Sequence, residues 1–489
     1  MTLSHPGSSW SQRVAHAGIW SFALHFAEQL CVFGRVFVVA VLLSPRDFGL
    51  YNMATITFMA LDALSRTGFE QALIQKKEDI RPYLEVAWTV RCMRGLLLAL
   101  LLFIAAPWVS AFFKEPDAMV FVRAIGLSFV FQGLINIGVV TFQKNLEFHK
   151  EFVYRFSGAC MDLVVTVTAA LWLRNTWALV VGYLAADLTR MLVSYWIHPF
   201  RPRLRFEFGK VKEMLSYGRW ILLFGVAVVA GENGAGIIIG RILGAAALGY
   251  FQLANRITSL AVRPLGITIH RVAFPAYSEL QDSAERLRDA YGKIAGVSAA
   301  ISIPAAVGIF CMGRDFTRIF LGTKWMPMVP VLLILSLSSL IVSIVWTGRP
   351  VFMGRGRPDI AFYMQLAMCA TLFSLIYPFS HRWGIMGGAL AMLSSSAAAM
   401  AVWYWNIRPQ MGIGAKALAL IFSPALIASL LMAGALAGLR ALTLPLVPNP
   451  HSWNIVWFAG MILLGIVIYL GALFLIRRRL PAYVLFDVL

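Results

Sequence analysis

Charged side chains recur inside the apolar stretches of this sequence. Arg256 and Arg263 lie seven residues apart, which is two helical turns, so their guanidinium groups share one face of a helix. Arg35 and Arg66 lie in earlier apolar stretches. An arginine donates paired hydrogen bonds from a planar, permanently charged fork, which suits anionic groups. Charges in apolar stretches usually face a water-filled interior, so we expect these four arginines to line a cavity and favour transport as the function.

An intramembrane arginine can instead pair with a neighbouring acid. Asp62 and Arg66 are four residues apart, and Asp187 and Arg190 are three apart. Both spacings bring side chains together on one face of a helix. We favour a local ion pair for Asp187 and Arg190, and a cavity position for Arg66.

Two acids occupy the middle of apolar stretches, Glu28 in the first stretch and Glu232 in the seventh. A carboxyl group in a medium of low dielectric holds its proton more readily, so either residue could carry a coupling proton. Asn233 and the glycines around Glu232 suggest local unwinding of that helix, which would free backbone carbonyls to bind a cation. Close helix packing through small residues explains the glycines equally well.

The elements that must position these residues are about fourteen apolar stretches of roughly 20 residues each. Of the 489 residues, 60% are hydrophobic and only 13% are charged, which is more apolar surface than a soluble chain of this length could bury. The sequence therefore predicts an all-α integral membrane protein. We expect helices over residues 14–43, 48–74, 83–112, 118–142, 152–173, 176–198, 216–243, 246–272, 292–312, 327–347, 360–379, 384–406, 416–440 and 453–476.

The connectors between these helices differ in charge. Alternate connectors hold 24 Lys and Arg residues on one side and 9 on the other. Basic connectors stay in the cytoplasm, so both termini should be cytoplasmic and the number of helices even. The net charge of +19 then reflects membrane topology, and we expect no nucleic-acid partner. The five cysteines and eight histidines have no metal-ligand spacing, and we expect no metal and no cofactor.

Residues also repeat at an offset of 200. The pairs that carry the signal are Gly18 and Gly218, Trp20 and Trp220, Gly34 and Gly234, and Gly49 and Gly249. Such a duplication predicts two six-helix lobes as parallel repeats, residues 1–200 and 201–410, and residues 411–489 would add two helices and a short basic tail. The connector near 275–291 reads as an amphipathic helix on the cytoplasmic surface, or as an ordinary surface linker.

Four short segments are similar to pieces of a known family. They are Leu43–Tyr51, Leu248–Arg256, Phe274–Asp282 and Leu321–Pro327. In their order and spacing they resemble the polysaccharide transporter family, the Wzx-type oligosaccharide flippases of the multidrug/oligosaccharidyl-lipid/polysaccharide exporter superfamily. The resemblance extends over most of residues 14–410.

The resemblance implies two lobes around a central cavity, with two appended helices. It implies movement of an undecaprenyl-diphosphate-linked oligosaccharide from the inner to the outer leaflet of the bacterial inner membrane, for exopolysaccharide, O-antigen or capsule synthesis. Further expected partners are membrane lipids, a coupling proton or sodium ion, and the polysaccharide polymerase machinery. The residues expected to hold the diphosphate are Arg35, Arg66, Arg256 and Arg263, and those expected to couple an ion are Glu28, Glu232 and Asn233.

Two other functions compete with this one. A drug or small-cation exporter of the same superfamily would prefer an acidic cavity, and the excess of arginine argues against it. A membrane polysaccharide polymerase or ligase would need a sizeable outer loop or a catalytic set. The largest outer connectors, 313–326 and 441–452, gather no such set. We therefore expect a transporter and not an enzyme.

Overall fold

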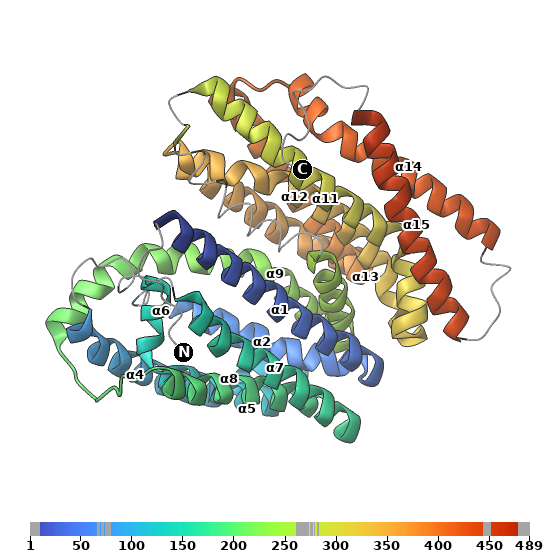
Figure 1. Cartoon of the computed structure of the whole chain (residues 1–489). Helices are drawn as coiled ribbons and strands as arrows, with labels where there is room; N and C mark the ends of the chain where they lie inside the picture. The colour runs from blue at the N-terminus through green and yellow to red at the C-terminus, as the bar shows by residue number, and fades with distance from the viewer. Residues whose placement is uncertain are drawn as a thin grey trace. The chain divides into compact units, whose positions relative to one another are not determined.

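The computed structural model describes residues 10–65, 69, 73, 80–145, 147–260, 273, 277, 279–280, 283–443 and 451–477. Within these ranges every regular element is helical. The helices are α1 (Trp10–Leu42), α2 (Pro45–Leu64), α4 (Arg81–Phe113), α5 (Ala118–Leu134), α6 (Val140–Lys144), α7 (Phe148–Leu173), α8 (Trp177–Ile197), α9 (Phe208–Leu260), α11 (Ala284–Phe316), α12 (Val329–Gly354), α13 (Pro358–Met411), α14 (Ala415–Thr443) and α15 (His451–Arg477) (Figure 1).

These helices make the chain a multi-pass, all-α membrane protein. Among the described residues, nine helices are long and apolar enough to cross a membrane, or ten if the bent pair formed by α5 and the helical turns after it counts as one span. The total of fourteen spans stays a prediction.

The two longest helices contain breaks at predicted boundaries. In α9, all of which the structure describes, the only residue with non-helical dihedral angles is Gly244, which lies between the expected helices 216–243 and 246–272. In α13 the break falls at Trp383 and Gly384, where the last expected helix of the second lobe begins. Both glycines have positive φ, 82° and 59°, which glycine adopts without steric cost. The two boundaries are confirmed.

The chain divides into two compact units. The first contains Met1–Asn233 with Gly244–Gly249, and the second contains Gly234–Leu243 with Tyr250–Leu489. In the first unit α7 packs on α1 and α8, and α5 packs on α2, α4 and α8. In the second unit α11 packs on α12 and α14, while α12 also packs on α13 and α14 on α15. The division at residues 200 and 410 and the parallel repeat stay predictions.

The helix expected over 118–142 is bent. After α5, the 3-10 turn η1 (Ile137–Val139) leads into α6, and the two parts are inclined by 69°. Asn136 stands at the bend and is fully buried. Its Oδ1 accepts a hydrogen bond from the Gly138 N–H at 2.9 Å, and its Nδ2 donates to the Phe200 carbonyl at 2.6 Å. A buried amide that satisfies freed backbone groups allows a helix to break in apolar surroundings.

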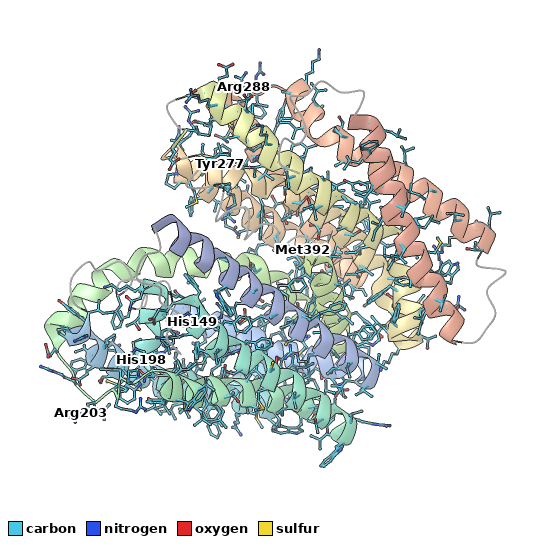
Figure 2. The ribbon with its side chains drawn as sticks, in the orientation of Figure 1. His149, His198, Arg203, Tyr277, Arg288 and Met392 are labelled. Carbon is cyan, nitrogen blue, oxygen red and sulfur yellow. The ribbon has the colours of Figure 1, made fainter. Side chains whose placement is uncertain are left out.

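The amphipathic connector differs from its expected placement. Residues 284–291 form the first two turns of α11, which continues to Phe316. The predicted separate helix on the membrane surface is therefore wrong for this part of the connector. Leu287 and Tyr291 are fully buried in the core of the second unit. Arg288, labelled in Figure 2, donates from Nη2 to the Met411 carbonyl at 3.1 Å. The apolar face of these turns therefore packs in the core of the second unit, where burial of apolar surface is favourable. Residues 275, 276, 278, 281 and 282 lie outside the described residues.

A close approach of backbones lies at the start of α2. Gly49 and Gly249 make equivalent contacts there, which we call the glycine crossing. A Cβ atom on Gly49 would lie 1.7 Å from the Ala245 carbonyl oxygen, and one on Gly249 would lie 1.9 Å from the Pro45 carbonyl oxygen. Pro45 and Ala245 are themselves 200 residues apart, like the two glycines. Only glycine fits at either position.

A carboxylate caps the helix that starts at this crossing. The Ala245 N–H, directly after the break in α9, donates to Glu115 Oε1 at 3.2 Å. Arg46 holds the same loop through Glu115 Oε2 at 3.2 Å and Asp117 Oδ2 at 2.9 Å. The negative carboxylate beside free N–H groups stabilises the new helix start.

Candidate functional site

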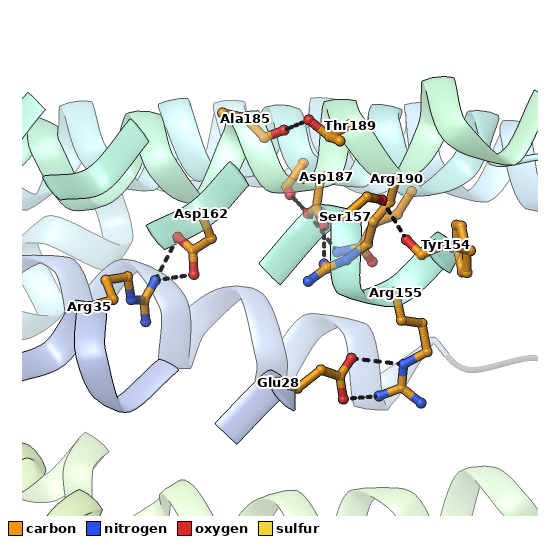
Figure 3. Close-up of polar contacts among 12 residues, drawn as sticks. Glu28, Arg35, Tyr154, Arg155, Ser157, Asp162, Ala185, Asp187, Thr189 and Arg190 are labelled. Carbon is orange, nitrogen blue, oxygen red and sulfur yellow. Dashed lines mark hydrogen bonds and ion pairs between the residues drawn. The ribbon is translucent and has the colours of Figure 1, made fainter. Parts of the chain in front are cut away.

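Two ion pairs join α1 to α7 inside the first unit. Arg155 donates from Nε and Nη2 to the two carboxylate oxygens of Glu28, both at 3.0 Å. Arg35 Nη1 lies 2.7 and 2.6 Å from the two oxygens of Asp162 (Figure 3). Both pairs join residues 127 positions apart, so the two helices run in the same direction with one register. Seven residues separate the charges on each helix, which returns them to the same face.

The pair between Arg35 and Asp162 is closed to solvent. The Arg35 and Asp162 side chains are 5% and 13% exposed. Tyr51 of α2 lies near the Arg35 guanidinium as a further polar neighbour. A buried charge needs such partners, and removing one leaves the other uncompensated. In this arrangement Arg35 fixes α1 on α7, and binding of an anion would require it to leave Asp162.

Arg155 is the exposed member of the second pair, with 44% of its side chain accessible. Its Nη1 also lies 3.5 Å from Glu151 Oε1, which accepts a shorter bond of 2.8 Å from Gln143 Nε2. The Glu28 and Glu151 side chains are 15% and 8% exposed. Two nearly buried carboxylates therefore share one arginine.

Sequence reasoning missed Arg155, Glu151 and Asp162 because it assigned them to connectors or did not single them out. A signal was present. Acid and base follow in the order Glu28 then Arg35 on α1, and in the reverse order, Arg155 then Asp162, on α7, both with a spacing of seven. Complementary charge at the same period predicts neighbouring helices.

A second polar cluster lies between α5 and α8. Asp187 is 1% exposed and accepts from Arg190 Nη1 at 2.8 Å. Gln132 Nε2 donates to the same carboxylate at 3.0 Å, and the Ser128 hydroxyl donates as well. The local pair favoured from the sequence is confirmed. Because the Asp187 carboxylate is hydrogen-bonded to three side chains, we assign the pair to the packing of α5 and α8.

Asp62 has a partner that its spacing did not predict. Arg94 of α4 donates from Nη2 to Asp62 Oδ1 at 2.5 Å, and from Nε to the Ser65 hydroxyl at 3.2 Å. Arg66, the local alternative, lies outside the described residues. Asp62 therefore links α2 to α4.

The four arginines expected around a cavity are only partly described. Arg66 and Arg263 lie outside the described residues. Arg35 belongs to the first unit, whereas Arg256 lies half-buried in α9 within the second unit. The two described arginines therefore belong to different units, and a common role of the four stays a prediction.

The region around Glu232 is helical. Glu232 is exposed, and Asn233 Nδ2 donates to the carbonyl of the preceding turn at 3.3 Å. Because helical dihedral angles continue to Gly244, the expected unwinding beside Glu232 is wrong. A Cβ atom on Gly234 would lie 2.6 Å from the Phe373 ring, so this glycine serves close packing. A role for Glu232 and Asn233 in ion coupling stays a prediction.

The sequence has relatives among known proteins. Residues 38–330 match a family model described as polysaccharide biosynthesis protein. The chain is 27% identical over 330 residues to the lipopolysaccharide biosynthesis protein WzxC of Escherichia coli (strain K12), an alignment that covers 66% of each chain. It is 24% identical over 335 residues to the succinoglycan biosynthesis transport protein ExoT of Rhizobium meliloti (strain 1021), covering 68% of each. The alignments thus span about two thirds of these relatives.

Solved structures share the fold. The lipid II flippase MurJ in an inward closed conformation superposes with a TM-score of 0.76 at 14% identity, over 94% of this chain and 99% of that one. An inward-facing multidrug resistance transporter of the MATE family gives a TM-score of 0.64 at 16% identity, over 79% of this chain and 95% of that one. At these identities the likeness describes the fold.

Proposed function

We propose that this chain, which belongs to the polysaccharide biosynthesis protein family, is a flippase for a lipid-linked oligosaccharide. Its substrate is an undecaprenyl-diphosphate-linked unit that moves from the inner to the outer leaflet of the bacterial inner membrane, for exopolysaccharide, O-antigen or capsule synthesis. The family match over residues 38–330 carries the proposal. A fold like that of the lipid II flippase over 94% of the chain supports it.

The chemistry of transport asks for charges within the membrane. A diphosphate and a hydrated glycan must pass about 30 Å of hydrocarbon, where neither is soluble. Arg256, Arg263 and Arg66 are the arginines proposed to hold the diphosphate through bidentate hydrogen bonds. Arg35 is proposed to contribute by holding α1 in place, since its guanidinium is engaged with Asp162.

Transport also needs a source of free energy. We propose coupling to a proton or sodium ion, with Glu28 as a participant because its nearly buried carboxylate is paired with the exposed Arg155. Glu232 and Asn233 are proposed in the same role in the second unit. The other partners are membrane lipids and polysaccharide polymerase machinery.

Deleting the gene and locating the lipid-linked sugar tests this function. A flippase predicts that finished units accumulate on the cytoplasmic leaflet and that surface polymer is lost. Accumulation of single units on the outer leaflet would instead indicate a polymerase. Normal polymer with increased drug sensitivity would indicate a drug exporter of the same superfamily.

A further inference from the structure

The start of α7 holds a cluster whose charge does not balance. Glu28 and Glu151 carry two negative charges, and Arg155 between them carries one positive charge. Both Glu28 oxygens lie 3.0 Å from Arg155, so this carboxylate is fully engaged. From the described residues, Glu151 receives only the weak 3.5 Å contact from Arg155 and one bond from Gln143, both on Oε1. Its Oε2 is buried and has no hydrogen-bond partner in the part of the chain that the structure describes.

Other charges near this cluster compensate one another. Lys150 Nζ lies 2.9 Å from Glu147 Oε2, and on α8 Arg190 is paired with Asp187. The described charged and titratable groups on the elements packed around Glu151 are Glu28, Cys31 and Arg35 on α1, Lys144 on α6, Glu147, His149, Lys150, Tyr154, Arg155, Cys160 and Asp162 on α7, and Tyr183, Asp187, Arg190 and Tyr195 on α8, with His198 following it. Within the cluster itself, the two carboxylates of Glu28 and Glu151 share the single positive charge of Arg155.

We propose that Glu151 is a proton-binding site through which the first unit takes up and releases a proton. This deepens the proposed transport function, since it names the carrier of the coupling ion. An uncompensated buried carboxylate is costly, and a proton removes the charge at once. A proton needs only one oxygen, whereas a metal ion bound by a protein takes several ligands. Among the described residues no group of three or more His, Cys, Asp or Glu side chains could hold a metal ion.

The step is a simple exchange with water. A proton from solvent bonds to Glu151 Oε2, and the cluster becomes neutral while Arg155 stays with Glu28. Oε1 continues to accept from Gln143 as a carbonyl oxygen. Release of the proton restores the negative charge on Glu151, so that the two carboxylates again share Arg155.

The exchange has a structural output. Gln143 lies on α6, directly after the 69° bend, so Glu151 links α7 to the short helix beyond that bend. The charge on Glu151 sets the strength of this link, because a hydrogen bond to a carboxylate is stronger than one to a neutral carbonyl. Proton binding therefore weakens the bond between α6 and α7.

Infrared difference spectroscopy during a pH titration tests the site with the proton itself as the ligand. The full chain, in lipid nanodiscs, should show a protonated carboxyl band that disappears at high pH. Glu151→Gln should abolish this band. Glu147→Gln, four residues earlier in the chain, should leave it unchanged. A band that survives in Glu151→Gln, or that is lost in Glu28→Gln instead, would overturn the proposal, as would its absence from the unmodified protein.

A second variant guards against a folding defect. Arg155→Gln removes the shared positive charge and keeps both carboxyl groups. The band should then persist to higher pH, because Arg155 is the cation that stabilises the ionised carboxylate. An unchanged midpoint of the infrared pH titration would show that Arg155 does not act on this carboxyl group, which would overturn the proposal.

Transport gives an independent readout. Glu151→Gln should make the rate of flipping insensitive to the pH gradient, measured as leaflet-resolved lipid-linked sugar. If the chain is not a flippase, this readout fails for the unmodified protein, whereas the infrared result still decides whether Glu151 binds a proton.

Discussion

At the scale of single residues, the charges of α1 are engaged by α7. Glu28 was expected to carry a proton and Arg35 to bind an anion, yet each lies in an ion pair with a residue 127 positions later. The two pairs differ in accessibility, because Arg155 is 44% exposed and Arg35 only 5%. The buried pair is suited to holding the helices together, and the exposed pair to exchange.

The buried pair leads to a stability prediction. Arg35→Met or Asp162→Leu should each destabilise the protein by about 3–5 kcal/mol, because one charge stays buried without its partner. The double variant should recover most of that loss. Thermal unfolding of the detergent-purified protein measures all three. A double variant as unstable as the sum of the single variants would show that the two side chains do not depend on each other.

The proposed diphosphate site leads to a second prediction. Arg256→Lys or Arg263→Lys should lower transport about ten- to a hundredfold, because one charge-assisted contact of about 1.5–3 kcal/mol is lost. Surface polymer yield at matched protein abundance is the measurement. Arg357→Lys, in an exposed pair with Asp359, is the control. Full export by the double variant Arg256→Ala, Arg263→Ala would show that neither residue binds substrate.

His198, after the end of α8, leads to a pH prediction. Burial and then Lys150 lower its pKa below the ordinary value. Its Nδ1 accepts the Phe200 N–H at 3.1 Å, which only the neutral ring can do. The stability contributed by the neutral His198 ring is therefore complete above about pH 6.5, the ordinary pKa of histidine. It is lost as the pH falls through the lowered pKa of the folded protein. Proteolysis within residues 201–207 should increase at acidic pH, and His198→Gln should remove most of this dependence.

At the scale of helices, close approaches of the backbone fix the packing. The glycine crossing places α2 against residues 244–249 of α9, with Gly49 and Gly249 in equivalent contacts. An added methyl group at either position would overlap a carbonyl oxygen. Such overlap forces the backbones apart, and no change of rotamer relieves it.

The glycine crossing can be tested by one methyl group. Gly49→Ala or Gly249→Ala should destabilise the protein by about 3 kcal/mol or more and reduce the yield of folded monomer. Gly308→Ala is the matched control, since a Cβ atom added there would meet no described atom within 4 Å and alanine favours a helix. Size-exclusion chromatography of a fluorescent fusion measures the yield. A normal yield of folded Gly49→Ala would show that α2 does not approach the Ala245 carbonyl this closely.

The sequence predicted helix breaks where glycine causes them and missed those that depend on distant contacts. Gly244 and Gly384 mark boundaries because positive φ is a local property. The bend at Asn136 could not be predicted, since the Phe200 carbonyl that satisfies its amide is 64 residues away. Glu28 was identified as unusual for its apolar surroundings, but its partner was missed, because the complementary seven-residue spacing of Arg155 and Asp162 was not compared with that of Glu28 and Arg35.

At the scale of the whole molecule, the distribution of basic connectors predicts the topology. The count of 24 Lys and Arg on one side and 9 on the other predicts that both termini lie in the cytoplasm. Reporter fusions after Arg203 and after Arg479 should both report a cytoplasmic location. Fusion after Arg174, in the connector before α8, should report the outside and is the internal control. An external signal at Arg203 or Arg479 would contradict the topology.

The register between α1 and α7 has a consequence for the order of synthesis. Glu28 and Arg35 leave the ribosome 127 residues before the side chains that neutralise them. At about 5–20 residues per second, this delay is roughly 6–25 s. During that time each charge within hydrocarbon costs about 2.5–3.5 kcal/mol. The ion pairs that hold α1 therefore form only after α7 has been synthesised.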